Sequence, residues 1–255
     1  MILTDTHCHL YTEEFDEDRE RVMARAAAAG VNKFFFPAID SSTHEKMLSL
    51  ENEYPGKCFS MMGLHPCSVK ENYKDELAIV EQYLQKRKFA AIGEIGLDFY
   101  WDKTFSPQQY EVFDMQMRWA LDYNLPIVIH TRNAMQETID AVKPFADKGL
   151  HGIFHCFGDS YYMAAQIIDM GFFLGIGGVV TYKKAGLDLV LDKISLEHIV
   201  LETDSPYLTP VPYRGKRNES SYLKFIAERI AEIKNITVEI VAKITTANAE
   251  KIFGC

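Results

Sequence analysis

Eight short apolar runs divide the chain, and each ends at a polar or glycine-rich point. Most of the runs are continuous rather than alternating, which is typical of strands buried on both faces. Strands of this kind belong to parallel sheets, whose connections are helical crossovers. The runs occupy residues 2–5, 33–39, 58–63, 89–96, 126–131, 152–156, 172–177 and 198–204.

Stretches with helical spacing separate and follow these runs. We expect helices at residues 16–30, 43–54, 75–87, 106–124, 135–148, 160–171, 184–194, 221–235 and 237–254. The alternation predicts one α/β domain over residues 1–255, a (β/α)8 TIM barrel. The length of 255 residues matches the ~250 residues typical of that fold. A doubly wound open sheet is the alternative, and the absence of a GxGxxG turn after the first run weighs against it.

Composition narrows the class of protein further. No apolar segment approaches the ~18 residues of a membrane span, and no basic segment followed by an apolar one suggests a secretory signal. The five cysteines are scattered without a CxxC pair, which favours free thiols in the cytoplasm. The net charge of −9 argues against a broad basic face that coats nucleic acid. It remains compatible with a nucleic-acid enzyme that has a local basic loop.

Ionisable side chains gather at the ends of the apolar runs, where barrel enzymes carry their active sites. Burying so many polar groups without partners would cost roughly 1–3 kcal/mol each. A bound divalent ion removes that cost, and imidazole and carboxylate ligands suit Zn, Mn or Mg. The proposed ligands are His7, His9, Glu94, His130, His155 and Asp204, and His65 follows the third run in GLHP.

The ligand set is too large for one catalytic ion, and it suits two divalent ions roughly 3.5–4 Å apart. Glu94 lies midway along the series and is expected to bridge the ions. Asp204 is expected to contact one ion and to orient or deprotonate the attacking water. Because alternate residues of a strand share a face, His7 and His9 should point into the barrel mouth and Cys8 toward the helices.

Cationic and aromatic side chains are interleaved in residues 206–220, after the last run. Cations for phosphate beside rings for base stacking suit single-stranded nucleic acid. A solvated surface loop is the alternative, but the position beside Asp204 favours substrate binding. Tyr100 and Trp101 could equally stack on bases or pack under a loop, and Arg132 could contact substrate or form a helix-start salt bridge. The loop side chains are Tyr207, Tyr213, Arg214, Lys216 and Arg217.

Five motifs occur in order along the chain. They are LTDTHCHL (3–10), GLHP (63–66), GEIGLDFYW (93–101), LPIVIHTRNA (125–134) and ISLEHIVLETDSPYL (194–208). Together they resemble the TatD family of metal-dependent deoxyribonucleases, which are barrels of the amidohydrolase-like, metallo-dependent hydrolase type. The resemblance runs from Ile2 to the last predicted helix.

The resemblance implies removal of nucleotides from DNA ends, assisted by Mg²⁺ or a related ion, with single-stranded or nicked DNA favoured. It implies that His65 and the loop after Asp204 contact the substrate phosphate. A hydroxide generated between two ions would attack phosphorus in line. One ion would be held by His7, His9, Glu94 and Asp204, and the other by Glu94, His130 and His155.

The chain departs from the family pattern at Tyr11, where Asp or Asn is usual, and at Gln136, where an acidic residue is expected. Neither is a proposed ligand, so we expect altered loop geometry or substrate preference rather than altered chemistry. A related barrel hydrolase acting on a small ester, lactone, amide or phosphoester is the main alternative. Many such enzymes bridge their ions with a carboxylated lysine, whereas residues 89–96 contain Glu94 and no lysine. A non-enzymatic barrel is disfavoured because every ligand is present, and no obligate protein partner is indicated.

Overall fold

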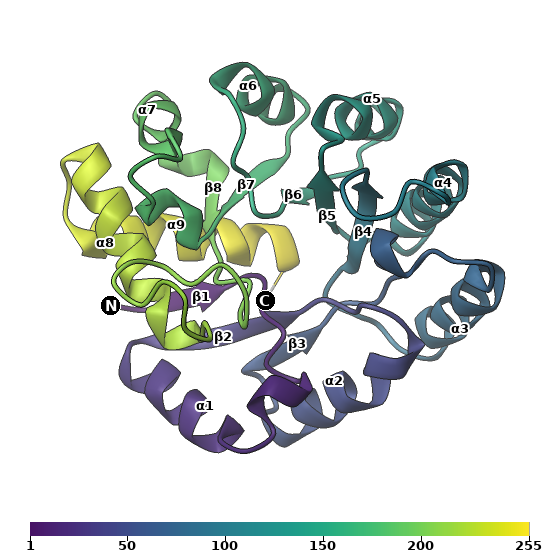
Figure 1. Cartoon of the computed structure of the whole chain (residues 1–255), viewed down its shortest axis with the longest axis horizontal. Coiled ribbons are helices and arrows are strands. Elements are labelled where there is room, and N and C mark those ends of the chain that lie inside the picture. The colour runs from purple at the N-terminus through teal and green to yellow at the C-terminus, as the bar shows by residue number, and fades with distance from the viewer. Residues whose placement is uncertain (255) are drawn as a thin grey trace.

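The computed structural model describes residues 1–254, in which a ring of helices surrounds eight strands (Figure 1). Each strand overlaps one of the predicted apolar runs. The strands are β1 (Leu3–Asp5), β2 (Val31–Phe36), β3 (Cys58–Ser60), β4 (Ile92–Asp98), β5 (Ile127–Arg132), β6 (Gly152–Phe154), β7 (Phe173–Ile176) and β8 (Ile199–Leu201). The helices are α1 (Arg19–Ala28), α2 (Ser41–Glu53), α3 (Tyr73–Lys86), α4 (Ser106–Tyr123), α5 (Met135–Ala146), α6 (Tyr161–Asp169), α7 (Leu187–Leu191), α8 (Leu223–Lys234) and α9 (Val238–Phe253).

The strands close into a ring. They pair in parallel in two groups, β1-β2-β3 and β4-β5-β6-β7-β8. A parallel bridge between Met62 and Ile92 joins the groups at one seam. At the other seam the backbone N–H of Thr6 donates to the carbonyl of Leu201 at 3.0 Å. The fold is therefore the predicted parallel barrel and not an open doubly wound sheet.

Local capping signals set the helix ends. Asp40 precedes α2, and its carboxylate accepts the backbone N–H of Ser42 at 3.1 Å. Thr237 precedes α9, and its hydroxyl accepts the N–H of Ile240. Gly30 follows α1 with a left-handed φ of 90°, and there the chain turns directly into β2. Because all the strands are parallel, their carboxyl ends lie on one face of the barrel.

The barrel interior contains an apolar plug below the strand ends. Phe35, Val128 and Val200 belong to this cluster, while residues beside them on the same strands pack against the helices. Helix α9 closes the opposite end of the barrel, because Ile252 joins the cluster and the ring of Phe253 stacks on Phe35 at 3.8 Å. Within residues 1–254, the interior is therefore covered by α9 at the end opposite the carboxyl ends of the strands.

Most element boundaries shift by a few residues from those expected, including those of β1 and α7. Strand β1 ends at Asp5, so the HCH sequence lies in the turn that follows it. Helix α7 covers only Leu187–Leu191 instead of residues 184–194, because Gly186 has a left-handed φ of 69° that ends the helix on its N-terminal side. Among residues 1–254 no helix has both the length and the apolar character needed to cross a membrane.

We predict that Phe35→Ala destabilises the barrel by about 3–5 kcal/mol, because the ring is 1% exposed and its loss leaves a cavity between the strands and α9. Urea unfolding should show a lower midpoint with an unchanged slope. Leu189→Ala is the control, since that side chain is 73% exposed and its loss should change stability by no more than about 0.5 kcal/mol. Equal stability of the two variants would show that α9 does not seal the interior.

Candidate metal centre

The six proposed ligands converge at the open end of the barrel. Glu94 and His130 lie on β4 and β5, His155 directly follows β6, and Asp204 follows β8. The prediction that the HCH sequence is part of a strand is wrong, because β1 ends two residues before His7.

The two histidines of the HCH turn nevertheless point the same way, with their Nε2 atoms 3.3 Å apart. Backbone hydrogen bonds fix the turn: the N–H of Cys8 donates to Phe35 and that of His9 to Ser205. Cys8 is fully buried, and its thiol lies 3.8 Å from the Phe35 carbonyl oxygen. Cys8 is therefore a packing residue, as predicted.

Glu94 lies at the centre of the group with one oxygen toward each pair of histidines. Its Oε2 is 3.1 Å from Nε2 of His7 and 3.8 Å from Nε2 of His9. Its Oε1 is 2.9 Å from Nδ1 of His130 and 3.2 Å from Nε2 of His155. The carboxylate is therefore positioned to be shared by two ions.

Asp204 completes the side of the site that contains the HCH turn. Its Oδ1 lies 3.7 Å from Nε2 of His7 and 3.6 Å from Nε2 of His9. Burial alone would raise the pKa of Asp204, but the neighbouring His9, His155 and His7 lower it. Burial would likewise raise the pKa of Glu94, which the surrounding histidines lower well below its usual value. Both carboxylates are therefore ionised, as metal ligands must be.

The outer nitrogens of three histidines face hydrogen-bond acceptors. Nε2 of His130 is 2.9 Å from the Asp98 carboxylate, and Nδ1 of His155 is 3.1 Å from Glu202. In each ring the outer nitrogen can donate to a carboxylate, and the inner nitrogen faces Glu94, where it would bind an ion. Metal-binding histidines are oriented in this way.

Tyr11 does the same for His9. Its hydroxyl donates to the carbonyl of Pro37, so it accepts from Nδ1 of His9, 2.9 Å away. The partner of His9 is thus a neutral phenol, which is 1% exposed.

The donor set fits divalent ions. With the proton of His9 on Nδ1, the inner nitrogens of His7 and His9 confront one another at 3.3 Å beside two ionised carboxylates. Lone pairs at that separation repel unless a cation or a proton lies between them. Three of the groups that could hold an ion are His7–His9–Glu94, His7–His155–Asp204 and Glu94–His130–His155.

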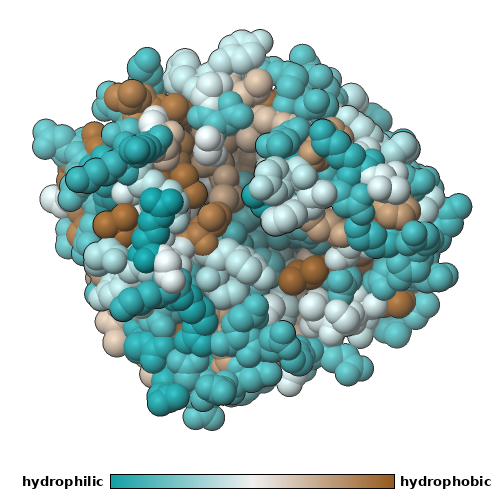
Figure 2. Space-filling view, viewed as in Figure 1, coloured by the Kyte–Doolittle hydropathy of each residue, from teal (hydrophilic) through white to brown (hydrophobic). Residues whose placement is uncertain are grey.

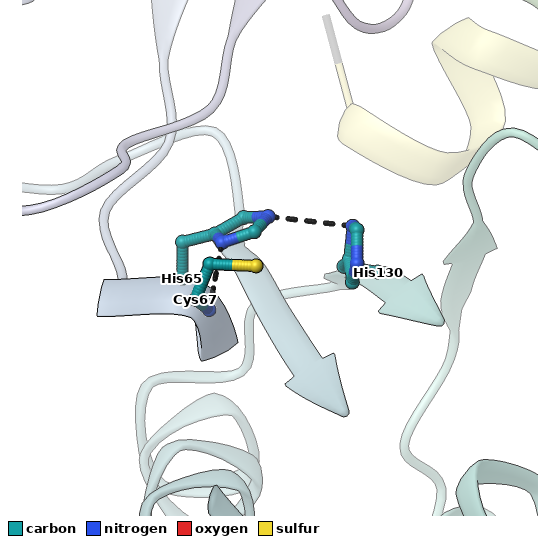
Figure 3. A group of neighbouring side chains, drawn as sticks. All are labelled: His65, Cys67 and His130. Carbon is teal, nitrogen blue, oxygen red and sulfur yellow. Dashed lines mark hydrogen bonds between the residues drawn. The ribbon is translucent and has the colours of Figure 1, made fainter. Parts of the chain in front are cut away.

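His65 differs from the other histidines of the site. It caps a short turn (Pro66–Ser68), and its Nδ1 accepts the backbone N–H of Cys67 at 3.0 Å (Figure 3). The ring proton is therefore on Nε2, which faces Nδ1 of His130 at 3.3 Å and Glu94 at 3.4 Å. Although His65, Cys67 and His130 are close enough to hold an ion, this tautomer makes His65 a hydrogen-bond donor toward the site.

Sequence reasoning missed Asp98 and Glu202, although the period of the strands contained the signal. Glu202 lies two residues from the interior Val200 and two from Asp204, so it shares their face. Glu202 is fully buried. Its side chain packs against Gly175 of β7, where the Cβ of any other residue would lie 2.2 Å from Oε2 of Glu202. Asp98 shares the inward face of β4 with Glu94 in the same way and is 1% exposed.

The loop after β8 is fastened to the barrel by buried polar contacts. The carboxylate of Asp5 accepts the N–H and hydroxyl of Thr203 and the hydroxyl of Ser220. Asn218 donates to the carbonyls of Thr203 and Tyr207 at 2.8 and 2.6 Å. These contacts give residues 203–220 a defined position at the rim of the hollow seen near the centre of this face (Figure 2).

Of the loop side chains expected to bind substrate, three are open to solvent and one is held by an ion pair. Tyr207 is half exposed and its ring lies edge-on to His9, while the Arg214 guanidinium lies 4.4 Å from the ring of Tyr182. Lys216 is exposed beside the Tyr213 ring. Arg217 instead pairs with Asp18 at 2.9 Å and donates to the carbonyl of Glu14, so it braces the loop against the start of α1.

A parallel barrel whose open end presents histidine and carboxylate side chains placed to bind metal on both sides of a central glutamate is typical of metal-dependent hydrolases. The sequence model of the TatD related DNase family matches residues 4–254. The chain therefore belongs to the TatD family.

Relatives of known sequence support this assignment. The chain is 40% identical over 253 residues to an uncharacterized metal-dependent hydrolase, YabD, of Bacillus subtilis, with 99% of each chain covered. It is 34% identical to the 3'-5' ssDNA/RNA exonuclease TatD of Citrobacter rodentium, covering 98% of this chain and 97% of that one. The crystal structure of the TatD homologue YjjV from Escherichia coli superposes with a TM-score of 0.93 at 28% identity, covering 99% of this chain and 98% of that one.

We predict that Glu202→Gln lowers the affinity for a divalent ion by about 10–100-fold, because the amide cannot supply the charge that orients and polarises His155. Chelator competition with Zn²⁺ and metal-free protein measures the effect. Glu197→Gln, an exposed change in the turn before β8, is the control and should bind as the wild type does. Unchanged affinity in a folded Glu202→Gln protein would contradict the role of Glu202.

Proposed function

We propose that this enzyme hydrolyses the phosphodiester bonds of DNA, removing nucleotides from single-stranded or nicked ends with the help of two divalent ions, Mg, Zn or Mn. The observation that carries the proposal is the position of Glu94, whose two oxygens face two separate pairs of histidines. When bound, such ions would acidify a water and stabilise the charge on the attacking and leaving oxygens.

The residues divide between the two ions around that shared carboxylate. His7, His9 and Asp204 would hold one ion together with Glu94. His130 and His155 would hold the other, each with its outer nitrogen on a carboxylate. The residue proposed to bridge the ions is Glu94, and residues 89–96 around it contain no lysine, unlike barrels that bridge their ions with a carboxylated lysine.

Two side chains are positioned to handle protons and charge. Asp204 is ionised and lies beside both histidines of the HCH turn, so it can accept a proton from the attacking water. His65 presents Nε2–H toward the same centre, where it can donate to a non-bridging oxygen of the phosphate.

The substrate proposal rests on the relatives and on the rim of the site. Proteins 32% and 34% identical to this chain, from Pantoea ananatis and Citrobacter rodentium, are named 3'-5' ssDNA/RNA exonucleases. Tyr207 offers a ring beside His9, and the exposed Arg214 and Lys216 of the same loop offer two cations for the strand that leads to the cleaved bond. We also propose that the enzyme acts in the cytoplasm, where thiols such as the buried Cys8 and Cys58 stay reduced.

End-labelled oligonucleotides test this activity. We expect the purified enzyme to shorten single-stranded DNA from an end when a divalent ion is supplied, and EDTA to abolish the reaction. Duplex DNA, nicked duplex and RNA of the same sequence define the preference. Turnover of lactones or small esters with no cleavage of any nucleic acid would overturn the proposal and favour the alternative hydrolase.

We predict that Asp204→Asn lowers kcat by about 10²–10⁴-fold while the oligonucleotide still binds, because the amide cannot take a proton from water. Steady-state cleavage and equilibrium binding of the same labelled strand measure the two effects. Asp169→Asn, an exposed change at the far end of α6, serves as the control. Wild-type turnover in Asp204→Asn would remove Asp204 from the reaction.

A further inference from the structure

We propose that Tyr100, Trp101 and Arg132 form a platform that stacks a nucleobase of single-stranded nucleic acid beside the metal centre. The inference rests on the proposed function and extends it by naming a subsite for the base next to the cleaved phosphodiester. No part of the hydrolytic chemistry described above uses these three side chains.

The platform is exposed although it is aromatic. Tyr100 and Trp101 are 50% and 68% exposed, and their rings meet edge to face at 4.9 Å. The guanidinium of Arg132 lies 3.9 Å from the centre of the Tyr100 ring and 5.1 Å from that of Trp101. The rings are therefore not packed under a loop, and a cation is held among them.

Asp98 ties this platform to the metal centre. One oxygen of its carboxylate accepts the backbone N–H groups of Tyr100 and Trp101, at 2.9 and 3.1 Å. The other oxygen lies 2.9 Å from Nε2 of the proposed ligand His130. A single buried side chain thus holds both a metal ligand and the turn that presents the two rings.

The strands position Arg132 from the other side. Arg132 pairs with Asp98 across β4 and β5, and its carbonyl accepts the N–H of Phe99 at 2.9 Å. It also lies two residues beyond His130, so the cation and the ligand leave the same strand end. The platform is built on strand ends and is fixed relative to the site.

The side chains of the platform are suited to stacking on a nucleobase. Flat rings with an arginine beside them stack on nucleobases of any sequence, and the guanidinium also attracts the adjoining phosphate. A single-stranded end exposes the faces of its bases, whereas a duplex keeps them stacked. The proximity to a phosphodiester-cleaving centre favours this occupant over a protein partner.

Tryptophan fluorescence tests binding directly. The chain has two tryptophans, Trp101 and the partly buried Trp119 of α4, so Trp119→Phe leaves the emission of Trp101 alone. A thymidine oligonucleotide with hydrolysis-resistant phosphorothioate linkages should quench this emission. An abasic strand of equal length should bind more weakly and leave the emission unchanged. Equal quenching by both strands would overturn the proposal.

Kinetics separate the platform from the chemistry. Trp101→Ala should raise KM for single-stranded DNA by roughly 5- to 100-fold, the size of one stacking interaction, with little change in kcat. Arg132→Lys should also raise KM, because lysine keeps the charge but not the planar stacking. Hydrolysis of methyl para-nitrophenyl phosphate, a small diester without a base, should be unchanged in both variants.

Tyr123→Ala is the matched control, since that exposed ring lies at the far end of α4. A KM for Trp101→Ala equal to that of Tyr123→Ala, with the wild type still cleaving DNA, would overturn the platform alone. If the wild type cleaves neither DNA nor the small diester, the proposed function fails first. A concentration-dependent dimer that buries Trp101 would assign the surface to a second copy of the chain and overturn the proposal.

Discussion

The structure of the site depends on the convergence of imidazole lone pairs and ionised carboxylates on one point. Glu94 is almost completely buried, and five histidines from four strand ends lie within 4 Å of its oxygens, namely His7, His9, His65, His130 and His155. Neutral histidines turn several imidazole lone pairs and two carboxylates toward one point, an arrangement that a divalent cation stabilises. The burial that raises the electrostatic cost also strengthens the attraction to a divalent ion.

The proposed histidine ligands differ in the groups that their outer nitrogens contact. The pair His130 and His155 is backed by two buried carboxylates, Asp98 and Glu202. His9 is backed by the neutral phenol of Tyr11 instead. Since an anionic partner raises the basicity of an imidazole ligand, the two sides of the site differ in the charge that they offer an ion. The difference lies in the contact behind each proposed ligand and not in the ligands themselves.

The fold and the location of the site could be predicted from the pattern of apolar runs in the sequence. Continuous apolar runs gave the parallel barrel, and the polar ends of the runs located the site. The convergence of His7 and His9 was expected from strand alternation, yet it arises from a turn fixed by the carbonyls of Phe35 and Ser205, which no local pattern reveals. The sequence prediction considered only Asp204 after the last strand, so it missed Glu202, which lies two residues earlier and faces the same way. Arg217 resembled a phosphate contact in sequence because its partner Asp18 is remote along the chain.

The count of divalent ions bound per chain tests the central claim most directly. Elemental analysis of the purified protein, after dialysis against Zn²⁺ or Mn²⁺, should give two ions per chain. The Glu94→Gln variant should retain at most one, because the shared carboxylate is lost while the fold remains. A fully active enzyme that contains no metal, or a Glu94→Gln protein that still binds two ions with unchanged affinity, would contradict the account.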